Sequence, residues 1–306
     1  MEVEEGQALL EKSGGSAAPA VPGKDDRCNP CRGGFWRYHF GADALLGAWL
    51  LLIGSALWMW MEADNVAEDA QLHNFAISFS FEMTLTSAGI FVVGSAYFVY
   101  LSYPEKMQQQ MESMQVMAGK AERGELSWVQ RYFTASEMLM ATWSFVFAFT
   151  PFIAYGLYAV IEYPSSSAGY VEILVAFFGI GLSCIWAFAA MPENMMKNEG
   201  RGSTYCHDSY LTKWWCCGGC CASDNWKSDM LVGLWMFTAL TFLGIPYAVW
   251  LLVEEPTELY AWIDALMILS FLGGMGLFTY SAYPENFGKS TAFDLITCSK
   301  AVDAGK

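Results

Sequence analysis

Six stretches of this chain carry no charged side chain, and each is 18 to 24 residues long. They comprise residues 44–61, 83–103, 138–161, 173–192, 230–253 and 265–284. At about 1.5 Å of rise per residue, a helix of this length crosses a hydrocarbon core of roughly 30 Å. The sequence therefore predicts an all-α fold: a polytopic membrane bundle of six transmembrane helices, with the lipid bilayer as its main partner.

The basic residues lie on only one side of this predicted membrane. All 16 Lys and Arg residues fall in the N-terminal segment, in the connections after the second and fourth spans, and in the C-terminal tail. The other three loops carry acidic residues and no basic ones. Because basic residues are retained in the cytosol during insertion, we expect both termini to be cytosolic. The net charge of −15 argues against binding to nucleic acid.

The spans share marks at fixed offsets. Each odd span opens with an acidic residue that a Trp follows six positions later, and each even span closes with Pro-Glu and has Gly about ten residues before that Pro. The marks are Asp43 with Trp49, Glu137 with Trp143, Asp229 with Trp235, and Pro104-Glu105, Pro192-Glu193 and Pro284-Glu285. Such agreement indicates three repeated helical hairpins. The Gly residues favour even spans packed at the centre, with odd spans inside as the alternative.

These marks divide the chain into seven segments. The predicted hairpin repeats are residues 37–106, 132–195 and 227–286. The other segments are a disordered cytosolic N-terminal segment (1–36), a cytosolic amphipathic linker (107–131), a Cys-rich cytosolic loop (196–226) and a cytosolic tail (287–306). In the linker, a stripe of methionines predicts a helix that either lies in the headgroup layer, binds a partner or rests on the bundle. The stripe consists of Met107, Met111, Met114 and Met117.

The first hairpin carries Gly54-Ser55 in one span, Gly94-Ser95 in the other, and Tyr103-Pro104 at its close. In these features it resembles the YrhK-like two-helix membrane domain, best over residues 37–106. Later copies depart from the pattern with Gly181-Leu182-Ser183 and Gly273-Gly274. The resemblance implies a membrane hairpin and brings no chemistry to named residues.

Glu82 lies within the second predicted span, about 12 Å of helix from its start near His73. Ser78, Glu82 and Thr86 stack at i, i+4 and i+8, which forms one polar stripe on a helix. An ionisable group inside a bilayer is costly, so the stripe is a candidate site for a cation or a proton. The alternative places Glu82 at the interface, with the hydroxyl groups bonded back to their own helix.

Five further acids are weaker candidates. Glu172 and Asp264 lie two positions nearer the starts of their spans than Glu82 does, which favours stabilisation of the helix start. Asp43, Glu137 and Asp229 would form a ring of carboxylates at the cytosolic end and attract cations. Each of these three is also a first-turn acid, and that position alone explains it.

Two odd spans contain proline. Thr150-Pro151 and Gly244-Ile245-Pro246 are expected to interrupt the third and fifth spans, since proline removes a backbone hydrogen bond. Broken helices build binding sites in many transporters, although kinks also serve packing alone.

The Cys-rich loop contains Cys216, Cys217, Cys220 and Cys221 directly after Trp214-Trp215. Thiols beside aromatic residues near a membrane favour S-palmitoylation. Inert reduced thiols are one alternative. A zinc site shared with Cys28 and Cys31 is the other, and it is disfavoured because 185 residues separate the two Cys-x-x-Cys pairs. We therefore predict no metal.

No span contains Lys or His, which excludes a retinal Schiff base and the usual haem ligand, and we predict no cofactor. No phosphate-binding loop or hydrolase motif occurs, so we do not expect an enzyme. The best hypothesis is binding or passage of a small solute or cation through the helix bundle. The alternative is a structural or assembly subunit, with membrane-protein partners or as a homo-oligomer.

Overall fold

The computed structural model describes residues 34–72, 75–165, 168–192, 194, 229–283, 286 and 292. Within these ranges all the regular structure is helical. Six helical segments are long and apolar enough to cross a membrane, which confirms the six predicted spans. They cover Asp43–Ala67, Glu82–Leu101, Glu137–Glu162, Gly169–Ala189, Leu231–Glu254 and Leu259–Ser281.

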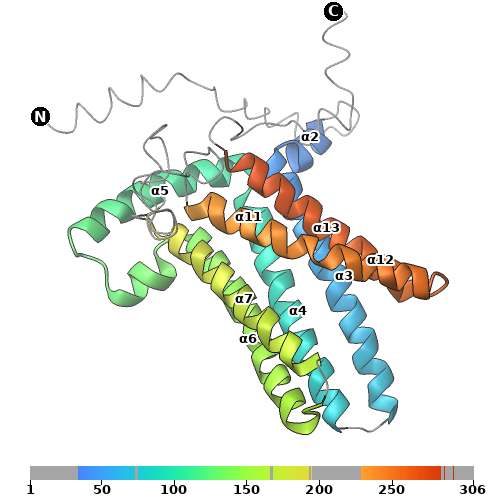
Figure 1. The fold of residues 1–306 in the computed structure, drawn as a ribbon. Coiled ribbons are helices and arrows are strands. Elements are labelled where there is room, and N and C mark those ends of the chain that lie inside the picture. The colour runs from blue at the N-terminus through green and yellow to red at the C-terminus, as the bar shows by residue number, and fades with distance from the viewer. Residues whose placement is uncertain are drawn as a thin grey trace, which may run out of the picture.

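The spans belong to three consecutive pairs of helices. The helices are α3 (Asp43–Leu72) and α4 (Phe75–Leu101), α6 (Glu137–Glu162) and α7 (Ala168–Ala189), then α11 (Asp229–Phe242) with α12 (Gly244–Glu254), and α13 (Leu259–Ser281). The short helix α2 (Gly34–Phe40) and the linker helix α5 (Pro104–Glu122) lie where α3 begins and α4 ends, which we call the terminal end (Figure 1). We call the opposite end, where the members of each pair are joined, the turn end.

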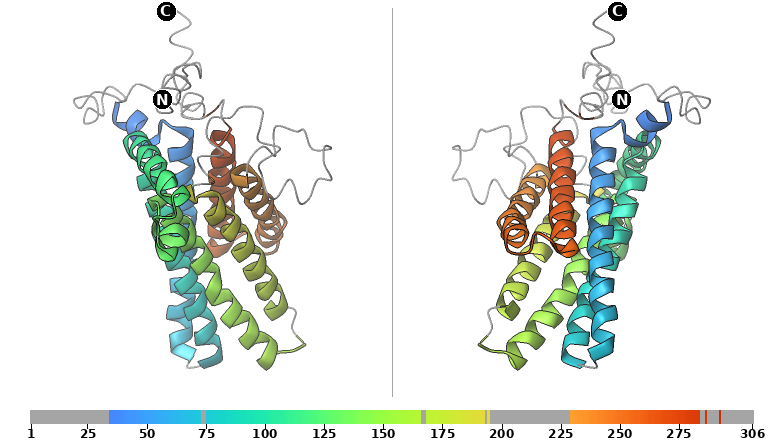
Figure 2. Two further views of the ribbon diagram at one scale, coloured as in Figure 1. Left: turned by 90° about the vertical axis from the view of Figure 1, so that its left-hand side faces the viewer. Right: turned by 90° about the vertical axis from the view of Figure 1, so that its right-hand side faces the viewer.

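The spans form a closed ring. Each span packs on its neighbours in the chain, and α13 packs on α3 to complete the circle. Figure 2 shows α13 beside the part of α3 nearer the terminal end, where the two helices pack on each other. Odd and even spans therefore alternate, and the expectation that the even spans gather at the centre is wrong. The ring is uneven, because α12 packs chiefly on α13 and diverges from α6 and α7 (Figure 1).

Small residues determine how closely the ring closes. A Cβ added to Gly274 of α13 would lie 2.9 Å from the carbonyl oxygen of Gly47 in α3, and a Cβ on Gly47 would lie equally close to the Gly274 carbonyl. Lipid provides no hydrophobic drive for helix association, so backbone contact of this kind holds the first and last spans together. The glycine of the even span thus contacts an odd neighbour and not another even span.

Buried hydroxyl groups link the first pair of helices. The Ser55 hydroxyl donates to the Leu51 carbonyl at 2.7 Å and lies 3.0 Å from the Ser95 hydroxyl, so Ser95 is the donor between the helices. Ser183 occupies the position in α7 that matches Ser95, nine residues before the closing proline. Its hydroxyl is buried and has no partner among the described residues. The repeat itself stays a prediction.

The two proline interruptions have different outcomes. α6 is continuous through Pro151, and the Thr150 hydroxyl donates to the Val146 carbonyl at 3.3 Å. The expected break in the third span is therefore wrong. The fifth span does break, because α11 ends at Phe242 and α12 begins at Gly244, two residues before Pro246. That break lets α12 take its divergent course.

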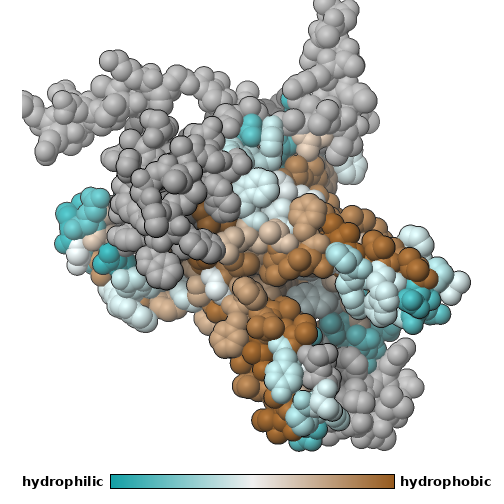
Figure 3. All heavy atoms as spheres, viewed as in Figure 1, coloured by the Kyte–Doolittle hydropathy of each residue, from teal (hydrophilic) through white to brown (hydrophobic). Residues whose placement is uncertain are grey.

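Large apolar side chains cover the outside of the ring. The most exposed include Ile161, Val253 and Leu243, whose side chains are 75%, 73% and 73% exposed. In the space-filling view, apolar surface extends over the α6–α7 and α12–α13 arms, with a recess between them (Figure 3). Such a surface requires lipid or another apolar partner around it. The chain is thus a multi-pass membrane protein.

The linker helix α5 rests on the bundle. Met114 is 3% exposed, and Met117 packs against a cluster that includes Leu139 of α6 and Ala187 of α7. The side chain of Met111 lies outside the described residues. Of the three interpretations of the methionine stripe, this contact favours a surface helix that packs on the spans.

Candidate functional site

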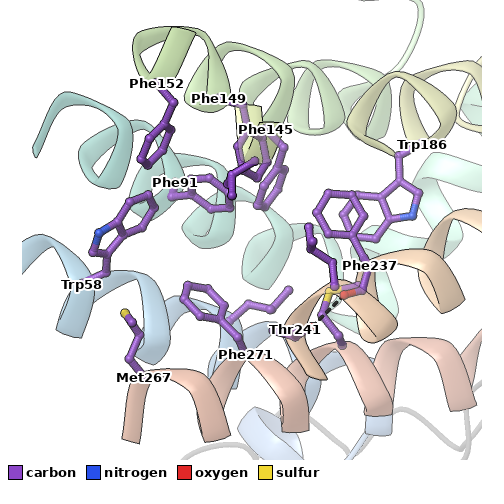
Figure 4. Close-up of a pocket in the computed structure, with 14 residues that line it drawn as sticks. Trp58, Phe91, Phe145, Phe149, Phe152, Trp186, Phe237, Thr241, Met267 and Phe271 are labelled. Atoms are coloured by element: carbon purple, nitrogen blue, oxygen red, sulfur yellow. Dashed lines mark hydrogen bonds between the residues drawn. The ribbon is translucent and has the colours of Figure 1, made fainter. Parts of the chain in front are cut away.

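A cavity of about 270 Å³ lies inside the ring. All six spans contribute to its wall, so it exists only when the ring is closed. The 14 lining residues are Leu51, Trp58, Phe91, Phe145, Phe149, Phe152, Val175, Trp186, Phe237, Leu240, Thr241, Met267, Phe271 and Met275. Figure 4 shows the labelled side chains directed from several helices toward one space. The volume approaches the range of about 300–1,000 Å³ that is typical of ligand pockets.

Helical spacing explains why these residues meet. Met267, Phe271 and Met275 follow one another at i, i+4 and i+8 on α13, and Leu51 and Trp58 lie seven residues apart on α3. Residues at these spacings share one face of a helix. The faces turned toward the ring interior therefore carry the lining, while the opposite faces carry the exposed apolar side chains.

Phe91 of α4 is the centre of the aromatic lining. Its ring makes edge-to-face contacts with Trp58, Phe145 and Phe149 at centroid distances of 5.4, 5.0 and 5.1 Å. Phe152 stacks on Trp58 at 5.7 Å. Such pairs contribute beyond the burial of their area, and they hold the wall in a defined shape (Figure 4).

The lining has few polar groups. Its one aliphatic hydroxyl, on Thr241, donates to the Phe237 carbonyl at 2.7 Å and is therefore already used (Figure 4). The Trp186 indole nitrogen is buried without a partner among the described residues, and its ring lies against Gly233 of α11. A hydrated ion would find little to replace its water shell here, whereas an apolar molecule fits the wall.

Glu62 forms the polar border of this cavity at the turn end. Its carboxylate accepts hydrogen bonds from the Trp58 indole at 3.0 Å, from the Thr84 hydroxyl of α4 at 2.8 Å and from the Asn65 amide at 3.5 Å. Because Trp58 lines the cavity, the Glu62 bond fixes the orientation of part of the wall. Sequence reasoning treated Glu62 only as a loop acid.

Glu172 and Asp264 lie near Glu62. Both carboxylates interact electrostatically with it. Glu172 is the fifth residue of α7 and Asp264 the sixth of α13, and neither lies in the first turn of its helix. The predicted helix-start role is therefore wrong for these two acids. Asp264 is 5% exposed, and no hydrogen bond or ion pair holds its carboxylate within the described part of the chain.

The predicted stripe of the second span does not line the cavity. Glu82 is exposed, and the exposed Thr86 hydroxyl donates to the Glu82 carbonyl at 2.7 Å. The side chain of Ser78 lies outside the described residues. The Thr86 bond agrees with the alternative in which hydroxyl groups bond back to their own helix. A role for Glu82 in ion or proton binding stays a prediction.

The acids of the terminal end have structural partners. The Asp43 carboxylate is 1% exposed and accepts a hydrogen bond from the Ala292 backbone at 2.8 Å. Glu137 accepts from the Gln110 amide at 3.0 Å, and both acids lie in the first turns of their helices. The side chain of Asp229 lies outside the described residues, and α11 begins at this residue. These contacts favour stabilisation of helix starts.

The cysteine cluster lies outside the described residues, so acylation stays a prediction for Cys216, Cys217, Cys220 and Cys221. Within the described ranges no group of His, Cys, Asp and Glu side chains is arranged to hold a metal ion.

Sequence reasoning missed the aromatic cavity. The signal was present in Phe145, Phe149 and Phe152, which share one face of the third span, but aromatic residues on a span are more often packing or lipid contacts. Only the ring order shows that the faces of six helices leave a space between them. Comparison with known protein families, with curated proteins and with solved structures gives no match for this chain. The resemblance to YrhK-like hairpins stays a prediction.

Proposed function

We propose that this membrane protein binds a small apolar molecule, such as a lipid chain, in the cavity of its ring. The observation that carries the proposal is a wall of aromatic and aliphatic side chains drawn from all six spans around about 270 Å³. An engineered apolar cavity of about 150 Å³ already binds benzene or xenon, so this volume is sufficient for a larger hydrocarbon. Binding within the bundle is favoured over passage of a hydrated cation, because the lining has so few polar groups.

A pair of matched substitutions tests the proposal. Leu240 lines the cavity, whereas Leu243 on the same span is 73% exposed. We expect Leu240→Trp to fill the cavity and to weaken binding of 1-dodecanol by about tenfold, equivalent to about 1.4 kcal/mol. Leu243→Trp adds the same side chain outside and should leave binding unchanged. Native mass spectrometry of the maltoside-solubilised chain measures the bound fraction. Absence of binding, or an equal loss in both variants, would refute the proposal.

A structural or assembly role is the second candidate, and the divergence of α12 favours it. α12 packs chiefly on one helix and exposes Tyr247, Trp250 and Val253. A partner protein could cover this face in place of lipid. Under this hypothesis a mild-detergent extract contains the chain in a stoichiometric complex. A monodisperse monomer that retains dodecanol would instead favour the binding role.

A further inference from the structure

Three acids from three helices lie one turn beyond the cavity wall. Glu62 is four residues after Trp58, Glu172 is three before Val175, and Asp264 is three before Met267. Residues at these spacings share a helix face, so each acid lies on the face that lines the cavity. In each case the step from the wall residue to the acid runs toward the turn end. Glu62, Glu172 and Asp264 therefore form an acidic border at the turn end of the cavity, which we call the mouth.

Asp264 is the acid whose position is hardest to explain by folding alone. It is 5% exposed in a membrane span, and no hydrogen bond or ion pair holds its carboxylate within the described part of the chain. The described ionisable groups that interact with it electrostatically are Glu62, whose charge has the same sign, and Tyr247 of α12. An ionised carboxylate in this setting costs free energy unless a cation accompanies it, and the alternative is that the group is protonated.

The chain has no Lys or Arg with which to neutralise the mouth. Residues 38–105, 132–196 and 228–288, which include all six spans and their turns, contain neither residue type. Only His73 among the basic side chains falls in these turns, and it lies outside the described residues. The described acids also do not form a compact metal site. Within the described residues, the positive charge that the mouth lacks therefore fits a ligand larger than a metal ion.

The aromatic wall and the acidic mouth together indicate the chemical class of the ligand. We infer that the cavity takes an amphipathic amine, whose hydrocarbon part fills the aromatic wall and whose protonated amino group lies at Asp264 and Glu62. Trp58 connects the two parts, since its ring faces the cavity and its indole nitrogen donates to Glu62 at 3.0 Å. An ammonium group at this border also meets the face of an aromatic ring, which attracts cations. This inference rests on the proposed function and specifies the ligand class.

Two probes with the same hydrocarbon chain test the inference. Dodecylamine is protonated near neutral pH, whereas 1-dodecanol is uncharged. We expect the full-length chain in maltoside to bind dodecylamine about tenfold more tightly than 1-dodecanol, measured by native mass spectrometry at neutral pH. Asp264→Asn should remove this preference by weakening the binding of dodecylamine. Glu172→Gln should reduce the preference, and it serves as a second variant should Asp264→Asn not fold.

Glu255→Gln is the matched control, because Glu255 is an exposed acid in the turn between α12 and α13. It removes the same charge near the same end and should keep the full preference for the amine. Equal binding of the two probes to the wild-type chain would overturn the inference while the apolar cavity stands. A preference that survives both Asp264→Asn and Glu172→Gln would overturn it too. Binding of neither probe would refute the proposed function together with the inference.

Discussion

The two ends of the bundle hold their carboxylates in different ways. At the terminal end, Asp43 is buried and accepts a hydrogen bond from the Ala292 backbone, and Glu137 accepts one from Gln110. At the turn end, Asp264 is also buried, at 5% exposed against 1% for Asp43, yet no hydrogen bond or ion pair holds it within the described ranges. A buried acid with donors around it contributes to folding. One without them costs free energy when it is ionised, which agrees with the binding role proposed for Asp264.

The same terminal end supplies donors to other groups. The His39 ring lies 2.7 Å from the Tyr103 hydroxyl, and burial together with the nearby Tyr38 raises the pKa of Tyr103 above its ordinary value. Tyr38 in turn donates to Glu105 at 3.4 Å. Polar side chains at this end thus form contacts with one another, whereas Asp264 at the turn end has no such contact among the described residues.

Substitutions at the acids of the two ends test this difference. The largest expected effect on stability is that of Asp43→Ala. The change leaves the half-buried Ala292 amide without its acceptor and should lower the free energy of unfolding by about 1–3 kcal/mol. Thermal unfolding of the detergent-solubilised chain measures it. Asp43→Asn keeps an acceptor oxygen and should lose less. If Asp43→Ala and the wild type melt together, the Ala292 contact has no structural role.

At the turn end we expect a substitution to change the free energy of unfolding in the opposite direction. Asp264→Asn removes a buried charge that no described group compensates, so the ligand-free chain should become more stable, by on the order of 1 kcal/mol. The same melting measurement, made after extensive detergent exchange, reports the shift. Glu255→Gln removes an exposed charge and should have no effect. A clear loss of stability in Asp264→Asn would show that this acid is structural, as Asp43 is.

The smallest expected effect on stability concerns Glu125, an exposed acid that forms an ion pair with Arg123. Arg123 donates to Glu125 at 3.1 Å, and this bond lowers the pKa of the Glu125 carboxyl below its ordinary value. A lowered pKa contributes stability above the unfolded-state pKa and loses it as the pH falls through the folded-state pKa. Solvent screens this exposed pair, so we expect no measurable change in melting temperature on Arg123→Gln.

The pKa itself is the sensitive measurement for that pair. In Arg123→Gln, an NMR titration of selectively labelled Glu side chains should show the Glu125 pKa returning to its ordinary value. An unchanged pKa would mean that the Arg123 contact does not persist in solution. Together the three substitutions separate a buried acid with donors, a buried acid without them, and an exposed acid with a partner.

The spans could be predicted from sequence because the bilayer imposes one length and one composition on every helix. Charge-free windows therefore found all six spans. The order of helices around the ring could not be predicted this way. Apolar residues surround each span on all sides, so periodicity does not distinguish a face toward lipid from a face toward the interior.

The candidate site depended on that missing order. Glu82 was attractive because it lies deep in a span, but depth does not determine the face that a side chain occupies, and Glu82 is exposed. Glu62 and Asp264 were assigned to a loop and a helix start from their positions along the chain. Their importance follows from the approach of α3 and α13, which are about two hundred residues apart in the sequence. Packing between the first and last spans therefore determines which acids lie together at the candidate site.

That packing has a consequence for synthesis of the protein. The ring closes through contact between Gly47 of α3 and Gly274 of α13. The first span therefore cannot make this contact until the sixth span has been synthesised. Five inserted spans would leave the aromatic wall open to the hydrocarbon interior, where bulk lipid can enter. The cavity is therefore complete only after the sixth span has been inserted, because residues of all six spans line it.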